Sequence, residues 1–133
     1  MSDKAHNALA LIKFNKDGLV PAIAQQHDTG EVLMMAWQNE EAVRETFATG
    51  AAVYWSRSRG TLWRKGESSG HTQRLIDYRV DCDGDTILML VDQIGPACHT
   101  NRPNCFFTSI QDEPVELTKP MDDGDERPDW KVT

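Results

Sequence analysis

Hydrophobic and polar positions alternate along much of this chain, and a period of two is the pattern of strands with one buried face. Together with short apolar runs, it predicts strands at residues 20–26, 31–37, 52–56, 62–65, 74–82, 86–94 and 105–110. A turn sequence ending in Gly30 separates the first two strands, and Asp83-Gly84 separates the fifth and sixth. Both turn sequences are typical of hairpins, so most of the chain is expected to form β-sheet.

One segment has the period of a helix instead. Asn39 is a residue type that caps helix N-termini, acidic residues follow it, and Val43 and Phe47 form an apolar stripe. Gly50 is the residue type at which helices end. We therefore expect an α+β, β-rich fold: a small mixed-sheet domain with one main helix.

The composition is that of a single globular domain. The chain has 133 residues, of which 39% are hydrophobic and 26% charged, and this length suffices for one domain with its own core. We expect the domain to span residues 1–111, and the acidic, proline-rich residues 112–133 to form an irregular tail. The apolar runs are far shorter than the ~20 residues of a membrane span, and the first residues lack the features of a secretory signal. A cytoplasmic location with no membrane partner is expected.

Charge is distributed unevenly along the chain. The formal net charge is −7, and residues 112–133 contain eight acidic against three basic residues. Residues 56–79 have the opposite balance, with six basic against two acidic residues. An acidic protein with one local basic segment is poorly suited to bind nucleic acid. It is better suited to bind a small anion, for which phosphate is the first candidate.

The basic segment also contains other residue types that suit a phosphorylated ligand. Arginine and lysine provide charge, serine and glycine provide hydroxyls and accessible backbone N–H groups, and tryptophan can stack on a base. A solvated basic surface is the simpler explanation, and the P-loop motif is absent. The candidate substrate-binding residues are Arg57, Arg59, Trp63, Lys65, Ser69 and Arg74.

The sequence Asp81-Cys82-Asp83-Gly84-Asp85 could place two kinds of metal ligand at one strand end. Side chains alternate along a strand, so Asp81 and Asp83 share one face, Cys82 lies on the other, and the last aspartate can rejoin the carboxylates across the turn. Carboxylate oxygens suit magnesium and thiolates suit zinc. The simpler alternative is an ordinary Asp-Gly hairpin with a half-buried cysteine.

The chain contains three cysteines, Cys82, Cys98 and Cys105. An odd number without an export signal indicates metal binding or catalysis rather than a disulfide framework. Structural zinc sites have four protein ligands, whereas catalytic zinc sites have three and leave one position for water. Three thiolates therefore fit a catalytic site, unless a histidine closes it. The histidines that could do so are His27, His71 and His99.

The spacing of the cysteines predicts a shared site. The strand expected at 86–94 is about 26 Å long at a rise of about 3.3 Å per residue. Cys82 precedes this strand and Cys98 follows it, so the two are expected to be far apart within one chain unless the loop doubles back. A zinc site across a two-fold interface resolves this, with Cys82 from one subunit and Cys98 and Cys105 from the other. We therefore expect a homodimer.

Four motifs carry a family resemblance. The chain contains VLMMAWQNEEA, YWSRSRGTLWRKGESSGHTQ, DCDGD and ACHTNRPNCFF, in that order. They resemble the motifs of the phosphoribosyl-AMP cyclohydrolases of histidine biosynthesis. One departure lies in the last motif, where the family usually has Gly and Ser and this chain has Asn101, Pro103 and Asn104. The cysteines keep their spacing, so the departure concerns the conformation of the loop and the role of the absent serine.

The resemblance implies a reaction and its ligands. In the reaction, water adds to position 6 of the purine of N1-(5-phosphoribosyl)-AMP and the bond to N1 then breaks. The resemblance also implies an intertwined homodimer in the cytoplasm. It implies zinc on Cys82, Cys98 and Cys105, and magnesium on Asp81, Asp83 and Asp85. His99 and His71 are the candidates for general base and general acid, with neither role assigned to either residue.

Two other functions fit part of this pattern. A zinc-dependent purine deaminase uses related chemistry, but its H-x-E and P-C-x-x-C signature is absent. A zinc-stabilised nucleotide-binding module would use the same cysteines and basic segment without catalysis. Ammonia release would indicate the deaminase, and binding without turnover would indicate the binding module.

Overall fold

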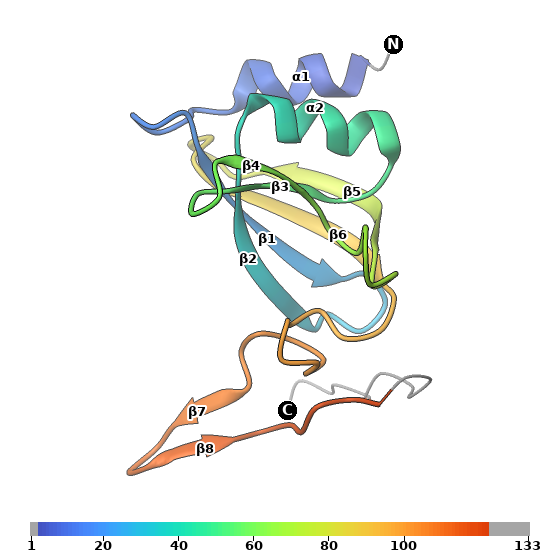
Figure 1. Cartoon of the computed structure of the whole chain (residues 1–133). Coiled ribbons are helices and arrows are strands. Elements are labelled where there is room, and N and C mark those ends of the chain that lie inside the picture. The colour runs from blue at the N-terminus through green and yellow to red at the C-terminus, as the bar shows by residue number, and fades with distance from the viewer. Residues whose placement is uncertain (1–2, 123–133) are drawn as a thin grey trace.

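The computed structural model describes residues 3–122 and shows a curled six-stranded sheet, with two helices lying side by side over it (Figure 1). The helices are α1 (Asp3–Leu11) and α2 (Glu40–Thr49). The strands of this sheet are β1 (Val20–Gln26), β2 (Val32–Gln38), β3 (Val53–Ser56), β4 (Thr61–Arg64), β5 (Gln73–Val80) and β6 (Ile87–Gln93).

The strand order is β4-β3-β2-β1-β6-β5, and neighbouring strands are antiparallel except for β1 and β6, which are parallel. This confirms the expected mixed sheet. Both predicted hairpins are present: β1 pairs with β2, with Ile23 opposite Met35, and β5 pairs with β6 across the turn after Val80. The chain thus has the turn 81–86 at one end of β6 and the loop 94–107 at its other end.

Helix α2 begins and ends where the sequence predicts. The side chain of Asn39 accepts a hydrogen bond from the backbone N–H of Ala42 at 2.8 Å, which caps the N-terminus. Gly50 has a φ of 73°, and its N–H donates to the carbonyl of Thr46 at 2.9 Å. This left-handed C-cap is one that glycine adopts without strain. The helix buries Ala42, Val43 and Thr46.

The prediction of one main helix is wrong, because the structure also contains α1. This helix buries the small side chains of Ala5 and Ala8 and leaves Leu11 63% exposed. A helix this short with so weak an apolar stripe is not stable alone, and packing against α2 and the core stabilises it. The local sequence therefore gives little signal for it. No helix within residues 3–122 is long and apolar enough to cross a membrane.

The chain after Cys105 also differs from the expected strand at 105–110. Only Thr108–Ile110 forms a strand, β7, and it pairs with β8 (Pro114–Glu116) in a separate two-stranded sheet. The predicted irregular tail, residues 112–133, therefore contains a strand near its start, and its residues 123–133 lie outside the part of the chain that the structure describes. The N–H of Cys105 donates to the carbonyl of Leu33 at 2.8 Å, which holds the chain against β2 before it turns away from the main sheet (Figure 1).

Candidate active site

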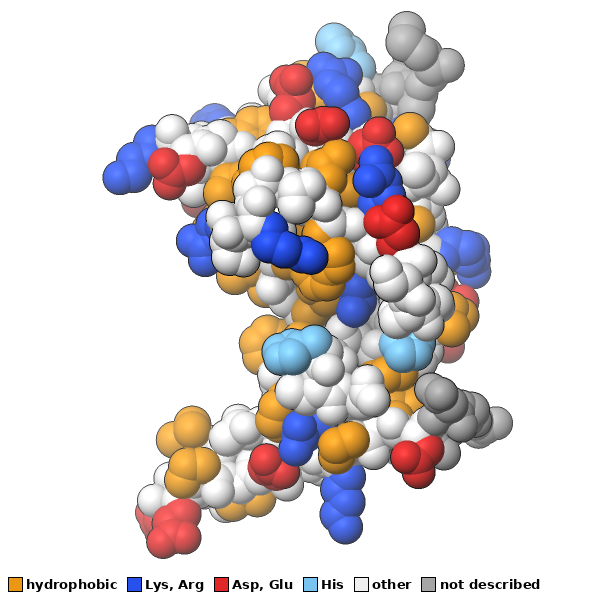
Figure 2. Space-filling view, in the orientation of Figure 1, with side chains coloured by type: hydrophobic (Ala, Val, Ile, Leu, Met, Phe, Trp, Pro, Cys, Tyr) orange, Lys and Arg blue, Asp and Glu red, His pale blue; other side chains and the backbone are white. Residues whose placement is uncertain are grey.

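A cleft of about 440 Å³ lies at the end of the sheet where β6 leads into the loop 94–107. One wall is formed by β4 and the loop that follows it, and the other by residues 96–105. Figure 2 shows basic and histidine side chains around the indentation between the sheet domain and the lower part of the chain. The predicted site residues that line the cleft are Arg59, Trp63, Lys65, Ser69, His71, Cys98, His99 and Cys105.

A row of buried polar side chains supports the cleft. The hydroxyl of Tyr54 donates to Gln73 at 2.6 Å, and the amide of Gln73 donates to Gln93 at 2.8 Å. Gln93 in turn donates to the carbonyls of His71 at 3.2 Å and Ile94 at 2.9 Å. Burial raises the pKa of Tyr54 above its usual value, so its hydroxyl remains a donor. The row joins β3, β5 and β6 to both walls of the cleft and fixes the backbone around it.

Backbone hydrogen bonds shape the loop that carries Cys98. The N–H of Cys98 donates to the carbonyl of Arg102 at 3.2 Å, and the N–H of Asn101 donates to the carbonyl of Cys98 at 2.9 Å. Asn101 has a φ of 64°, a left-handed conformation that asparagine tolerates better than most residues. Asparagine in place of the glycine of the usual motif is therefore compatible with this turn.

The two thiols of the cleft have opposite pKa shifts. Burial would raise the pKa of Cys98, but a hydrogen bond from Thr100 Oγ1 to its Sγ at 3.1 Å and the charge of Arg102 hold that pKa below its usual value. Burial and the charge of Cys98 raise the pKa of Cys105 to about 12. Without metal, Cys98 therefore loses its proton more readily than Cys105, and a bound dication would favour loss of the proton from Cys105.

Lys65 brings a positive charge to the same cleft. Its Nζ donates to the carbonyl of Ala97 at 2.6 Å and lies 5.5 Å from the ring centroid of Trp63. Burial lowers the pKa of Lys65, and the nearby charges of Cys105 and Cys98 oppose that shift. The wall formed by β4 therefore presents an ordered cation towards the thiols.

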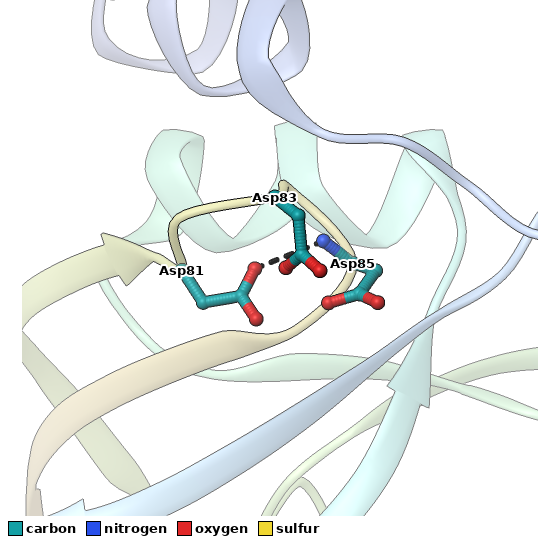
Figure 3. A group of neighbouring side chains, drawn as sticks. All are labelled: Asp81, Asp83 and Asp85. Atoms are coloured by element: carbon teal, nitrogen blue, oxygen red, sulfur yellow. Dashed lines mark hydrogen bonds between the residues drawn. The ribbon is translucent and has the colours of Figure 1, made fainter.

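Asp81, Asp83 and Asp85 lie together in the exposed turn between β5 and β6 (Figure 3). One carboxylate oxygen from each lies within 4.8 Å of the others. Asp81 Oδ1 accepts hydrogen bonds from the backbone N–H groups of Asp85 at 2.9 Å and Thr86 at 3.2 Å. The turn can approach α1 closely because Gly84 has no Cβ, which would collide with the carbonyl of Leu11.

The three carboxylates influence one another's ionisation. Slight desolvation would raise the pKa of Asp81, but hydrogen bonds with Asp85 and the N–H of Thr86 hold it below its usual value. Hydrogen bonds with Asp83 and Asp81 raise the pKa of Asp85, and slight desolvation and the charges of the same two residues add to the shift. A hard divalent cation bound between these carboxylates would favour their charged forms.

Cys82 lies in this turn, and the structure does not bring it to the other two cysteines. The seven residues of β6 separate the turn from the cleft (Figure 1), which is roughly 20 Å at the rise of a strand. Within residues 3–122, the aspartates of the turn are the one group of three or more potential metal ligands that lie together. The predicted separation of Cys82 from Cys98 within one chain is thus confirmed.

Two predicted substrate-binding residues lie outside the cleft. The guanidinium of Arg57 stacks 4.7 Å from the ring centroid of Trp37. Arg74 lies on β5, with its Nη2 3.5 Å from Asp92. His27, the third histidine considered as a zinc ligand, lies 3.9 Å from the same aspartate. These three side chains therefore make their contacts on other parts of the surface.

Other residues of the site were not predicted from the sequence. Thr100 donates to Cys98 Sγ, and the side chain of Asn104 donates to Glu31. Glu31 is 73 residues from Asn104 in sequence, and no spacing rule indicates such a pair. Thr100 follows Cys98 by two residues, a spacing at which a hydroxyl can reach the sulfur. The sequence therefore could have predicted this hydrogen bond.

Basic side chains beside thiols and histidines in one cleft suit an enzyme that acts on a small anionic substrate. The family model for phosphoribosyl-AMP cyclohydrolase matches residues 34–107, a range that includes every residue lining the cleft. The chain belongs to the phosphoribosyl-AMP cyclohydrolase family.

Several relatives are similar over most of their length. A phosphoribosyl-AMP cyclohydrolase of Paramagnetospirillum magneticum is 70% identical over 105 residues, which are 79% of this chain and 80% of that protein. Phosphoribosyl-AMP cyclohydrolase 2 of Pseudomonas fluorescens is 64% identical over 116 residues, covering 86% of this chain and 79% of the relative. The enzyme of Acidiphilium cryptum is 61% identical over 111 residues, which are 84% of this chain and 96% of the relative.

Proposed function

We propose that this protein hydrolyses N1-(5-phosphoribosyl)-AMP, opening its purine ring between N1 and position 6 in histidine biosynthesis. The observation that carries the proposal is the cleft, which joins two thiols and two histidines to the basic wall of β4. The names of the relatives support the same activity. Water contributes its oxygen to carbon 6, the bond from that carbon to N1 breaks, and N1 takes a proton.

The basic wall suits the charge of this substrate. Arg59 and Lys65 supply cationic donors, and Ser69 supplies a hydroxyl in a loop that also presents backbone N–H groups. The indole of Trp63 is held between Tyr54, at a centroid distance of 5.4 Å, and Lys65, where an aromatic face can pack against a base. We assign the phosphates and purine of the substrate to this wall.

Cys98 and Cys105 fit a zinc ion as two thiolate ligands, and we propose that Cys82 of a second copy supplies the third. The support is the donor chemistry of the two thiols, together with the position of Cys82 at the far end of β6. When bound with three ligands, zinc lowers the pKa of a water to about 7, which provides a nucleophile at neutral pH. The active protein is then an intertwined homodimer with two shared sites.

His71 and His99 are proposed to move protons between the attacking water and the ring nitrogen. The backbone of His71 is held by Gln93, and its ring packs against Gly95, where a Cβ would collide with it. His71 therefore has a defined position on one wall, whereas His99 is exposed on the other. A general base and a general acid on opposite walls suit a reaction in which one atom loses a proton and another gains one.

Asp81, Asp83 and Asp85 are proposed to hold magnesium. The convergence of their oxygens within 4.8 Å and the preference of magnesium for carboxylate ligands support this. In the proposed dimer, this turn lies beside the cleft of the other subunit, where magnesium can help to bind a substrate phosphate. We also propose a cytoplasmic location, and the acidic net charge of −7 accords with a lack of nucleic-acid binding.

Assay of the purified protein with the cyclic nucleotide tests the function. We expect ring opening without ammonia release, loss of turnover after chelation, and recovery on addition of zinc. Ammonia release would instead indicate a deaminase, and binding without turnover in zinc-loaded protein would indicate a binding module.

Mixing of inactive variants tests the shared site. Cys82→Ser and Cys98→Ser homodimers should each lose zinc and activity, because every site in them lacks one thiolate. After mixing and subunit exchange, heterodimers should regain one intact site and a corresponding part of the activity. Full zinc content in the Cys82→Ser protein would contradict the sharing.

A further inference from the structure

The hairpin of β7 and β8, with its flanking residues 106–118, forms an arm that projects from the main sheet (Figure 1). Each of its strands has only three residues, and an isolated two-stranded hairpin is marginally stable at best in water. Four of its large apolar side chains are exposed, and Figure 2 shows apolar groups near its tip. They are Phe106 at 56%, Ile110 at 81%, Val115 at 41% and Leu117 at 52% exposure.

The base of the arm is nevertheless fixed to the cysteine loop. Arg102 Nη2 lies 3.0 Å from Glu116 Oε2, and its guanidinium stacks 4.1 Å from the ring centroid of Phe107. The N–H of Met121 donates to the carbonyl of Asn101 at 2.7 Å. Contacts with the loop that carries Cys98 and Cys105 thus fix the direction of the arm. The apolar surface of the arm therefore stays exposed in a defined orientation, in which a partner can bind it.

A groove of about 570 Å³ lies at the other end of the sheet, between α1, α2 and β5. Its lining includes Lys4, Leu11, Phe47, Ile76, Tyr78 and Val80. Leu11 is 63% and Ile76 41% exposed, so the groove offers apolar surface to an incoming chain. Val80 comes two residues before Cys82, which places one end of the groove directly beside the metal-ligand turn.

We propose that the arm of one copy of this protein docks in the groove of a second copy, and reciprocally. The inference rests on the proposed shared zinc site. Where Cys82 of one copy joins Cys98 and Cys105 of the other, the groove end at Val80 lies beside Phe106, the first residue of the arm. Both arms then bind in the same way, as a two-fold axis requires.

The length of the arm agrees with this occupant. From Cys105 to the hairpin tip at residue 111 the chain extends about 20 Å, and from Val80 to Leu75 the groove wall extends about 16 Å, at the rise of a strand. The tip carries Asp112 and Glu113, and the groove lining carries one charge of opposite sign, Lys4, and one of like sign, Asp77. Within one chain the arm and the groove lie at opposite ends of the sheet (Figure 1), so the arm does not reach its own groove.

A charge-swap cycle in the full-length, zinc-loaded protein tests the docking. We expect Ile110→Glu in the arm and Ile76→Lys in the groove each to raise the dimer dissociation constant at least tenfold, measured by sedimentation velocity. In the double variant each glutamate meets a lysine of the other copy, so the constant should return to within about threefold of the original. Met35→Glu changes an exposed apolar residue outside both surfaces, and it should shift the constant less than threefold.

The outcomes separate this docking from the shared site. If the cysteine variants complement each other on mixing but Ile110→Glu leaves the dissociation constant unchanged, the arm does not dock in the groove and the shared zinc site stands. If both single variants weaken the dimer and the double variant weakens it further, the two surfaces do not meet, which overturns the docking. An active wild-type monomer that holds its full zinc would overturn the shared site and the docking together.

Discussion

Asn104 Nδ2 donates a hydrogen bond to Glu31 Oε2 at 2.9 Å, and both side chains are buried. The Oδ1 of Asn104 also accepts from the N–H of Phe106 at 2.8 Å. Cys105 lies between these two residues, and its own N–H is bound to Leu33. The asparagine that replaces the serine of the usual motif therefore fixes the backbone that carries one thiol.

Replacement of Asn104 should affect both stability and metal binding. We expect Asn104→Ala to lower the free energy of unfolding by about 1–3 kcal/mol, because a buried carboxylate loses a donor. The zinc dissociation constant should rise, because Cys105 is held less firmly. Urea unfolding and competition with a chromophoric chelator measure the two effects. Asn104→Ser, which retains a hydroxyl, should have smaller effects, and equal effects of the two changes would contradict this role.

Local signals predicted α2 and both hairpins of the main sheet. The Asn39 cap, the Gly50 C-cap and the Asp83-Gly84 turn each determine backbone conformation within a few residues, so the sequence alone shows them. In contrast, α1 depends on packing against α2, and β8 depends on its pairing with β7. Stability that comes from distant contacts leaves little trace in a local pattern.

The residues of the candidate active site likewise fall into those that local sequence signals predicted and those that depend on distant contacts. Residue types and spacing indicated the thiols, the histidines and the acidic turn. The structure places two of the thiols, Cys98 and Cys105, and two of the histidines, His71 and His99, in one cleft. Spacing could not show that Arg59 lines this cleft while Arg57 stacks on Trp37, because the twist of the β3–β4 hairpin decides it. Nor could it show Glu31, whose partner comes from the far end of the chain.

The close approach of Gly84 to α1 gives a sharp stability test. Gly84 has a φ of 79°, and an added Cβ would collide with the carbonyl of Leu11. Gly18 has a similar φ of 74°, with no atom near the position of its Cβ. We expect Gly18→Ala to cost about 1 kcal/mol of unfolding free energy from the backbone conformation alone, and Gly84→Ala to cost roughly 2–4 kcal/mol. Urea unfolding compares the two, and equal losses would show that α1 can move away without cost.

Zinc affinity should increase with pH well above neutrality. The pKa of Cys105 is raised to about 12 in the metal-free protein, so this thiol stays protonated up to at least pH 9 and must release its proton when zinc binds. Higher pH favours that release, so the affinity should rise about tenfold per pH unit for this proton. Chelator competition at several values between pH 7 and 9 measures the slope. An affinity that stays constant over this range would mean that the thiol is already ionised.

The two neighbouring arginines offer a matched pair for substrate binding. Arg59 lines the cleft, with its Nε 3.3 Å from Ser56 Oγ, whereas Arg57 lies over Trp37. Loss of a charge-assisted hydrogen bond to a phosphate costs about 1.5–3 kcal/mol of binding. Arg59→Ala should therefore raise KM at least tenfold with kcat nearly unchanged, since the contact is made equally in the ground state and the transition state. Arg57→Ala should change KM less than threefold in the same steady-state assay. A larger effect at Arg57 than at Arg59 would mean that the substrate phosphate binds on the outer face of the β3–β4 hairpin.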